Sequence, residues 1–127
     1  MLKDGALKGQ TIIVTGGGTG LGRSMGKYFL ELGANLVITS RKIEVLEKSA
    51  KELEEETGGT VLPVQCDVRD YEQVENVLKV TEERFGQING LLNNAEWGLK
   101  FDMCIKESPS LIIVDLIKLE PHFGISI

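Results

Sequence analysis

Short β-branched runs alternate with amphipathic stretches between Gln10 and Asn93, and this alternation limits the folds that are open to the chain. The strand-like runs are residues 11–15, 35–39, 60–65 and 88–93. Between them, apolar residues recur every three or four positions, as on one face of a helix. Strands that alternate with helices form βαβ units, so we expect a parallel sheet with helices on both faces.

The order of the strands follows from their connections, which are right-handed in almost all parallel units. We expect an α/β fold of about four strands in the order 3-2-1-4, which is one half of the doubly wound parallel sheet, a partial Rossmann fold. The alternation stops at Ala95, and residues 96–127 contain two prolines and one long apolar run. The sequence therefore predicts a Rossmann half-domain at residues 1–95 and a divergent tail at residues 96–127.

The apolar run of the tail, Leu111–Leu119, is rich in β-branched residues. If nothing covered the strand at residues 88–93, that strand would be an exposed apolar edge, which promotes aggregation. One interpretation is that Leu111–Leu119 packs on or beside this strand. The other is a disordered or poorly packed tail, because Asp115 and Lys118 interrupt the run.

A glycine cluster joins the first strand to the first helix and reads Thr15-Gly16-Gly17-Gly18-Thr19-Gly20-Leu21-Gly22. A helix N-terminus offers unpaired amides and a partial positive charge, and glycines let the backbone approach a pyrophosphate closely. Gly22 is also expected to allow close packing of helix on strand. Because strand, loop and helix stand in the required order, we expect phosphate binding here rather than a plain turn.

The second strand is followed by a basic pair, in the sequence Thr39-Ser40-Arg41-Lys42. Proteins that use NAD place an acidic residue here for the ribose hydroxyls. An Arg can instead pair with a ribose 2′-phosphate through its planar guanidinium. The alternative is that Arg41 and Lys42 are solvated charges at a helix start, although cations are mildly unfavourable there. We therefore expect NADP(H) as the cofactor.

Three motifs follow one another in the first 95 residues: Thr15-Gly16-x-x-x-Gly20-x-Gly22, Asp67-Val68 and Asn93-Asn94-Ala95. Together they resemble the short-chain dehydrogenase/reductase family. The stretches TGGGTGLG, SRK and QCDVRD at residues 15–22, 40–42 and 65–70 are similar to the 2,4-dienoyl-CoA reductases, and the peroxisomal trans-2-enoyl-CoA reductases look nearly as similar. The resemblance implies an ancestor that reduced an unsaturated acyl-CoA with NADPH.

The resemblance also implies the roles of single residues. The pyrophosphate would be held by Gly16, Gly17, Gly18, Thr19, Gly20, Leu21 and Gly22. Ser40 and Arg41 would contact the 2′-phosphate, Asp67 and Val68 the adenine, and Asn94 and Ala95 the ribose and nicotinamide side. For Asp67 the alternative is that it caps the turn before the third helix. The half-domain at residues 1–95 is thus expected to bind NADP.

The residues that perform the family's chemistry are not found in this sequence. The resemblance implies a catalytic Ser and a Tyr-x-x-x-Lys pair, but Tyr28 and Tyr71, the only tyrosines, are followed four positions later by Leu32 and Glu75. The Asn-Asn-Ala motif continues with Glu96 in place of Gly. Without a positioned acid, reduction loses a factor of about 10²–10⁴. We therefore predict no catalytic residue, and the segments of the substrate pocket and of the family's dimer interface are missing as well.

These observations leave three functions open. The chain is an oxidoreductase whose remainder was removed or replaced, a non-catalytic NADP-binding remnant such as a truncated or frame-shifted product, or an interaction module whose glycine loop binds nothing. The missing catalytic residues favour the second function for this chain and the first for its lineage.

Composition and charge argue against several other classes. A net charge of −5 does not suit nucleic-acid binding, and no run approaches the ~20 apolar residues of a membrane span. No apolar stretch that could serve as a secretory signal precedes Lys8, so we expect a cytoplasmic protein, with an organelle not excluded. Cys66 and Cys104 have no partner at metal-ligand spacing, so no metal site is predicted.

Overall fold

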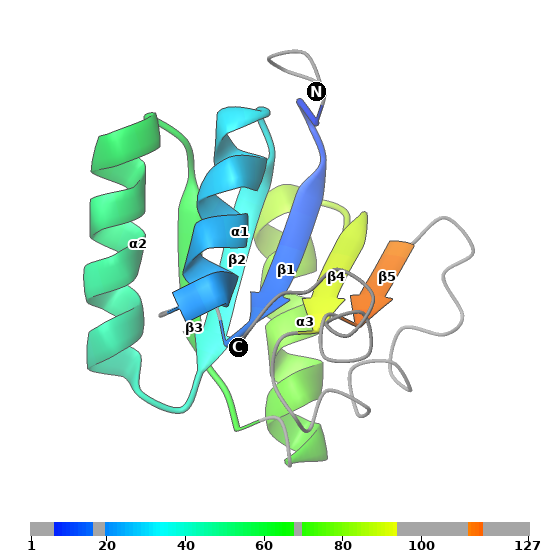
Figure 1. Cartoon of the computed structure of the whole chain (residues 1–127). Coiled ribbons are helices and arrows are strands. Elements are labelled where there is room, and N and C mark those ends of the chain that lie inside the picture. The colour runs from blue at the N-terminus through cyan, green and yellow to red at the C-terminus, as the bar shows by residue number, and fades with distance from the viewer. Residues whose placement is uncertain (1–6, 17–19, 68–69, 94–111, 116–127) are drawn as a thin grey trace.

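Five strands form one parallel sheet in the computed structural model of the chain, which describes residues 7–16, 20–67, 70–93 and 112–115. The strands are β1 (Thr11–Thr15), β2 (Asn35–Ser40), β3 (Val61–Gln65), β4 (Gly90–Asn93) and β5 (Ile112–Asp115). Their order across the sheet is β3-β2-β1-β4-β5 (Figure 1). The predicted order 3-2-1-4 is confirmed, and β5 adds a strand beside β4.

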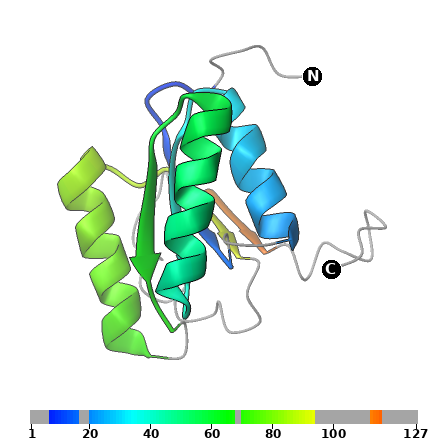
Figure 2. The ribbon, with the colours of Figure 1, turned by 90° about the vertical axis from the view of Figure 1, so that its left-hand side faces the viewer.

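The helices of the described ranges that cover the sheet are α1 (Gly20–Glu31), α2 (Ile43–Thr57) and α3 (Tyr71–Phe85). Figure 2 shows α1 and α2 on one face and α3 on the other, so the prediction of helices on both faces is confirmed. This placement follows from right-handed crossovers on the two sides of β1. Within the described ranges, no helix is both long enough and apolar enough to cross a membrane.

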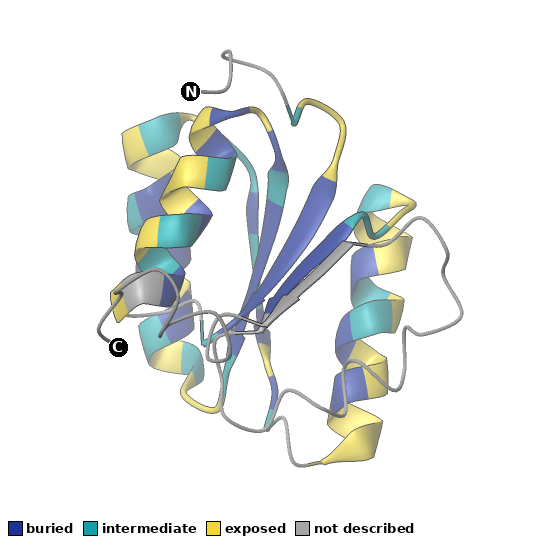
Figure 3. Cartoon of the chain, turned by 45° about the vertical axis from the view of Figure 1, so that its right-hand side comes forward, coloured by how far each residue is buried: buried dark blue, intermediate teal, exposed yellow. Residues whose placement is uncertain are grey.

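The core consists of two layers, because successive side chains of a strand point to opposite faces of the sheet. Ile12 and Val14 pack in the layer under α1 and α2, whereas Ile13 packs in the layer under α3. In Figure 3 the strands β1 and β2 are buried along most of their length and the helices are exposed on their outer sides. Full burial of each such side chain stabilises the fold by about 1.5–3 kcal/mol. The packed core therefore holds the ends of these strands in fixed positions.

The close contact between α1 and β2 depends on a glycine in the middle of the helix. A Cβ atom added at Gly26 would lie 2.8 Å from Cδ2 of Leu36, which is fully buried. The sequence assigned this kind of contact to Gly22, which is buried in the first turn of α1. At Gly26, one turn further along, this close approach places α1 directly against β2, and the expectation for Gly22 stays a prediction.

The fifth strand comes from the tail. β5 pairs in parallel with β4, from Gly90 opposite Ile112 to Asn93 opposite Asp115. The interpretation that Leu111–Leu119 lies beside the fourth strand is confirmed for Ile112–Asp115, and the alternative of a disordered tail is wrong for these four residues. The other residues of that run lie outside the described residues, as does the domain boundary predicted at Ala95.

Candidate nucleotide-binding site

The candidate residues gather at the carboxyl edge of the sheet, where β1, β2 and β3 end. The chain continues from β1 to β2 on one side, while β4 lies on the other side of β1, so the edge above β1 is the point where the strand order reverses. Ligands of open α/β sheets bind outside the carboxyl ends of the strands at such a point. The topology therefore brings the predicted glycine loop, basic pair and Asp67 to one edge.

The glycine connection between β1 and α1 has a backbone that other residues rarely adopt. Gly16 and Gly20 have φ angles of 69° and 60°, in the left-handed region that favours glycine. The Gly16 amide donates to the Thr39 carbonyl at 2.8 Å, which ties the loop to the end of β2. A Cβ atom at Gly20 would meet no atom within 4 Å, so the backbone there borders open space. Gly17, Gly18 and Thr19 lie outside the described residues.

The first turn of α1 leaves the positive end of the helix dipole without an acidic side chain of its own. Leu21 and Gly22 belong to this turn. Arg23, in the same turn, points its charge at α2, where its guanidinium lies 3.4 Å from Glu52 and 3.7 Å from Glu56. The backbone of this turn can thus accept an anion, as predicted for a phosphate site.

The basic pair lies where β2 ends. Arg41 is exposed, and within the described part of the chain its guanidinium forms no ion pair. The Ser40 hydroxyl accepts a hydrogen bond from the Lys42 amide at 3.3 Å, and the Ser40 carbonyl accepts one from the Cys66 amide at 2.8 Å. Gln65 donates from its side-chain amide to the Arg41 carbonyl at 3.0 Å. These hydrogen bonds fix the backbone at the end of β2, and the Arg41 guanidinium remains available to bind an anion.

Asp67 follows β3 and is half-buried. Its amide donates to Oε1 of Gln73 at 2.8 Å, and its carbonyl accepts from the Asp70 amide at 2.9 Å. The cap of α3 is Asp70, whose Oδ1 accepts from the Glu72 amide at 3.0 Å. Asp70 is thus the N-cap of α3 itself, and both roles considered for Asp67, adenine contact and cap of the preceding turn, stay predictions. Val68 lies outside the described residues.

Cys66 lies under this edge with 1% of its surface exposed. Burial raises the pKa of its thiol to about 12, and the negative charges of Asp67 and Asp70 add to the effect. The raised pKa keeps the thiol protonated at neutral pH, which makes it a weak nucleophile. Among the described residues, no group of three or more His, Cys, Asp or Glu side chains could hold a metal ion.

The nicotinamide side of the predicted site is described only up to β4. Asn93 pairs with Thr15 across the strands, and the Thr15 hydroxyl donates to the Leu92 carbonyl at 3.4 Å. Asn94 and Ala95 lie outside the described residues. Tyr28 and Tyr71 lie on α1 and α3, with 40% and 47% of their surfaces accessible.

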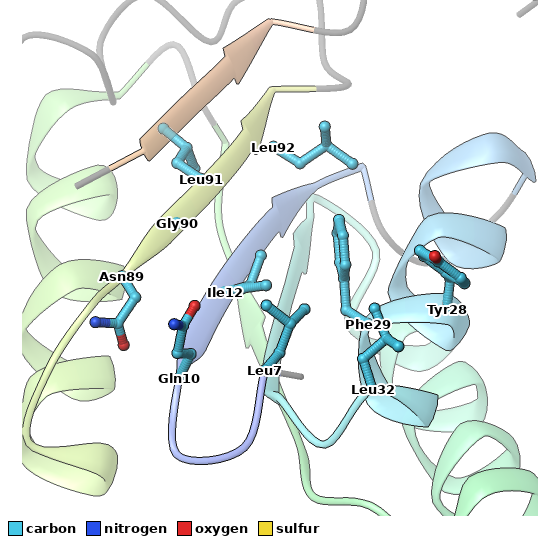
Figure 4. Close-up of a pocket in the computed structure, with 10 residues that line it drawn as sticks. All are labelled: Leu7, Gln10, Ile12, Tyr28, Phe29, Leu32, Asn89, Gly90, Leu91 and Leu92. Atoms are coloured by element: carbon cyan, nitrogen blue, oxygen red, sulfur yellow. The ribbon is translucent and has the colours of Figure 1, made fainter. Parts of the chain in front are cut away.

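An apolar cavity of about 200 Å³ opens on the face of the sheet that carries α1 (Figure 4). Its lining comes from the N-terminal turn, β1, α1 and the residue after it, and from β4 with the residue before it. The lining residues are Leu7, Gln10, Ile12, Tyr28, Phe29, Leu32, Asn89, Gly90, Leu91 and Leu92. None of them belongs to the predicted nucleotide contacts, so this cavity is separate from the candidate site.

The fold and the candidate site are those of a nucleotide-binding α/β protein, and comparison with known proteins agrees with this class. A family model described as short chain dehydrogenase matches residues 10–112. The chain belongs to the short-chain dehydrogenase family, as the motifs predicted. A probable 2,4-dienoyl-CoA reductase of Caenorhabditis elegans is 41% identical over 96 residues, which are 75% of this chain and 31% of the relative. The predicted resemblance to the dienoyl-CoA reductases is thus confirmed.

Solved structures match the same region. A citronellol catabolism dehydrogenase of Pseudomonas aeruginosa PAO1 superposes with a TM-score of 0.70 at 42% identity, over 73% of this chain and 38% of the other. The L-sorbose reductase of Gluconobacter frateurii, solved with NADPH and L-sorbose, also gives a TM-score of 0.70, at 32% identity over 73% of this chain and 35% of the other. The chain therefore spans about a third of the length of these relatives.

Proposed function

We propose that this chain is the NADP(H)-binding portion of a short-chain dehydrogenase/reductase whose lineage reduces an unsaturated acyl-CoA. The observation that carries the proposal is Arg41, an exposed cation at the end of β2 with no ion pair among the described residues. It lies at the same sheet edge as the left-handed glycines Gly16 and Gly20. A phosphate-binding loop and a separate cation fit the two phosphate groups of NADP(H).

Each part of the edge would bind one part of the nucleotide. The loop from Gly16 to Gly22 would accept the pyrophosphate on backbone amides at the start of α1. Arg41, with Ser40, would bind the 2′-phosphate, and Asp67 and Val68 would contact the adenine. Asn94 and Ala95 would line the ribose and nicotinamide side. NADPH, when bound, supplies the hydride.

The proposal that the lineage reduces an unsaturated acyl-CoA is supported by the names of similar proteins. Those named 2,4-dienoyl-CoA reductases include the protein of Caenorhabditis elegans and a peroxisomal one of Danio rerio, which is 36% identical over 89 residues. We propose that these 127 residues bind the nucleotide but do not reduce such a substrate by themselves. They contain no Tyr-x-x-x-Lys sequence, so they provide no activated tyrosine to donate the proton.

A titration with NADPH and NADH tests the proposal. The unchanged chain should bind NADPH more tightly than NADH, and Gly20→Val should abolish binding because the branched side chain enters the space next to the phosphates. Gly9→Val is the matched control. Gly9 also has a positive φ, of 83°, and open space around its Cβ position, but it lies in the turn before β1 at the opposite edge.

The control should lower stability to a similar extent through backbone strain and leave binding intact. A chain that is folded and binds neither nucleotide would overturn the proposal and favour the interaction module. Oxidation of NADPH that depends on added enoyl-CoA or dienoyl-CoA, and that Gly20→Val abolishes, would overturn the statement that the chain is inactive.

A further inference from the structure

We propose that Gln65 is a positioning residue that holds Arg41 in place for the 2′-phosphate and thereby sets the preference for NADPH over NADH. The inference rests on the proposed function. It assigns a role to a side chain that would not itself touch the nucleotide.

The geometry that carries the inference lies at the ends of β2 and β3. Gln65 is the last residue of β3 and stands opposite Ser40, the last residue of β2. Strand pairing ends there, so Arg41 lies just beyond the sheet. Its carbonyl accepts the Gln65 side-chain amide at 3.0 Å. Among the described residues, this is the only hydrogen bond shown for that carbonyl.

The bond from Gln65 complements the neighbouring backbone bond, in which the Cys66 amide donates to the Ser40 carbonyl at 2.8 Å. Together they fix two successive carbonyls, one on each side of the Arg41 Cα atom. A long side chain such as that of Arg loses considerable conformational freedom when it binds a ligand. A fixed backbone position reduces the further freedom that must be lost, so the phosphate contact becomes stronger.

A second glutamine, Gln73, holds the backbone at Asp67, the residue proposed to contact the adenine. It should therefore affect the binding of both cofactors. Gln73 accepts the Asp67 amide at 2.8 Å and donates to Oδ2 of Asp70 at 3.0 Å. The adenine is common to NADPH and NADH, whereas the 2′-phosphate belongs to NADPH alone. The two glutamines should therefore have different effects on the ratio of the two affinities.

The experiment replaces each glutamine by methionine, which keeps the length of the side chain and removes the amide. Gln65→Met should weaken NADPH about two- to tenfold, the range of one hydrogen bond, and leave NADH unchanged. Gln73→Met should weaken both nucleotides by the same factor. Gln87→Met is the control, because Gln87 also donates its side-chain amide to a backbone carbonyl, that of Gly9 at 2.6 Å, at the opposite edge of the sheet.

The control should change neither affinity. Gln65→Glu provides a second variant at the same position, since a carboxylate cannot donate to the Arg41 carbonyl, and it should also lower the ratio of NADPH to NADH affinity. Unchanged affinities in both Gln65 variants, or an equal loss for the two nucleotides, would overturn the inference. A failure of the unchanged chain to bind NADPH would instead overturn the proposed function itself, and the two failures are therefore distinguishable.

Discussion

Arg41 is the side chain on which the choice of cofactor should depend. A hydrogen bond to a charged group contributes about 1.5–3 kcal/mol, so Arg41→Asp should weaken NADPH by roughly ten- to a hundredfold and erode or reverse the preference for it. Isothermal titration of both nucleotides measures the effect. Lys51→Asp makes the same change of charge on the exposed side of α2 and should leave the preference intact. Equal affinities for NADPH and NADH in the unchanged chain would contradict this expectation.

The buried thiol of Cys66 should make the stability of the fold depend on alkaline pH. The pKa of the thiol is raised in the folded chain from 9.0 to about 12, chiefly by burial. The unfolded chain therefore loses this proton first as the pH rises. The contribution of the buried thiol to the free energy of unfolding is fully present below pH 9 and is lost as the pH rises to 12. Roughly 2–3 kcal/mol is lost by pH 11.

Urea unfolding of the unchanged chain and of Cys66→Ala at pH 7, 9, 10 and 11 isolates this contribution. Lysines and tyrosines also titrate in this range, but they do so in both proteins, so the difference between the two free energies reports on the thiol. That difference should shrink as the pH rises above 9. A difference that stays constant up to pH 11 would mean that the thiol is not protected in the folded chain.

The starts of α2 and α3 differ in a way that should be measurable. Asp70 caps α3 through its side chain, whereas Lys42, at the same position of α2, forms no capping hydrogen bond and places a cation at the positive end of the helix. Lys42→Ser should therefore raise the free energy of unfolding by about 0.5–1 kcal/mol, and Asp70→Ala should lower it by about 1 kcal/mol. Chemical denaturation measures both. A destabilised Lys42→Ser variant would show that Lys42 makes a stabilising contact instead.

Sequence periodicity was sufficient to predict the elements from β1 to β4, because each is defined by residues that are close in the chain. The cap of α3 was harder to predict, since Asp67 and Asp70 both precede the helix and only the position of its first residue, Tyr71, decides between them. The pairing of β5 with β4 remained one of two interpretations, because two charged residues interrupt an otherwise suitable strand.

The parts of the site that the sequence could not predict are contacts between distant residues. The bond from Gln65 to the Arg41 carbonyl joins residues 24 positions apart, and no local pattern indicates it. The same holds for the ion pair between Arg23 on α1 and Glu52 on α2. The residue types at the glycine loop and at Arg41 could be predicted because their chemistry is tied to fixed positions in a strand–loop–helix unit.

Among the residues that the structure describes, β3 and β5 border the sheet, and these two borders are built differently. β3 forms one border and contains Pro63, whose missing amide makes that strand a poor template for a further strand. β5 forms the other border. Because β5 pairs with β4, the strand that carries the apolar residues Leu91 and Leu92 lies inside the sheet. The position of β5 therefore decides whether β4 is an interior strand or an exposed edge.

Amide hydrogen exchange tests this arrangement directly. If β5 is a regular strand of the sheet, the amides in Ile112–Asp115 that bond to β4 should exchange slowly, with protection nearer to that of β1 than to that of the turn before it. Replacing both Ile112 and Ile113 by Pro removes two successive amides, of which one points toward β4, and fixes two φ angles, so it should detach β5 and leave β4 as an edge. We then expect faster exchange in β4 and a soluble-aggregate peak on size exclusion, whereas β1 stays protected. Fast exchange throughout Ile112–Asp115 in the unchanged chain, or a monodisperse double-proline variant with a protected β4, would show that β4 does not depend on β5 for its cover.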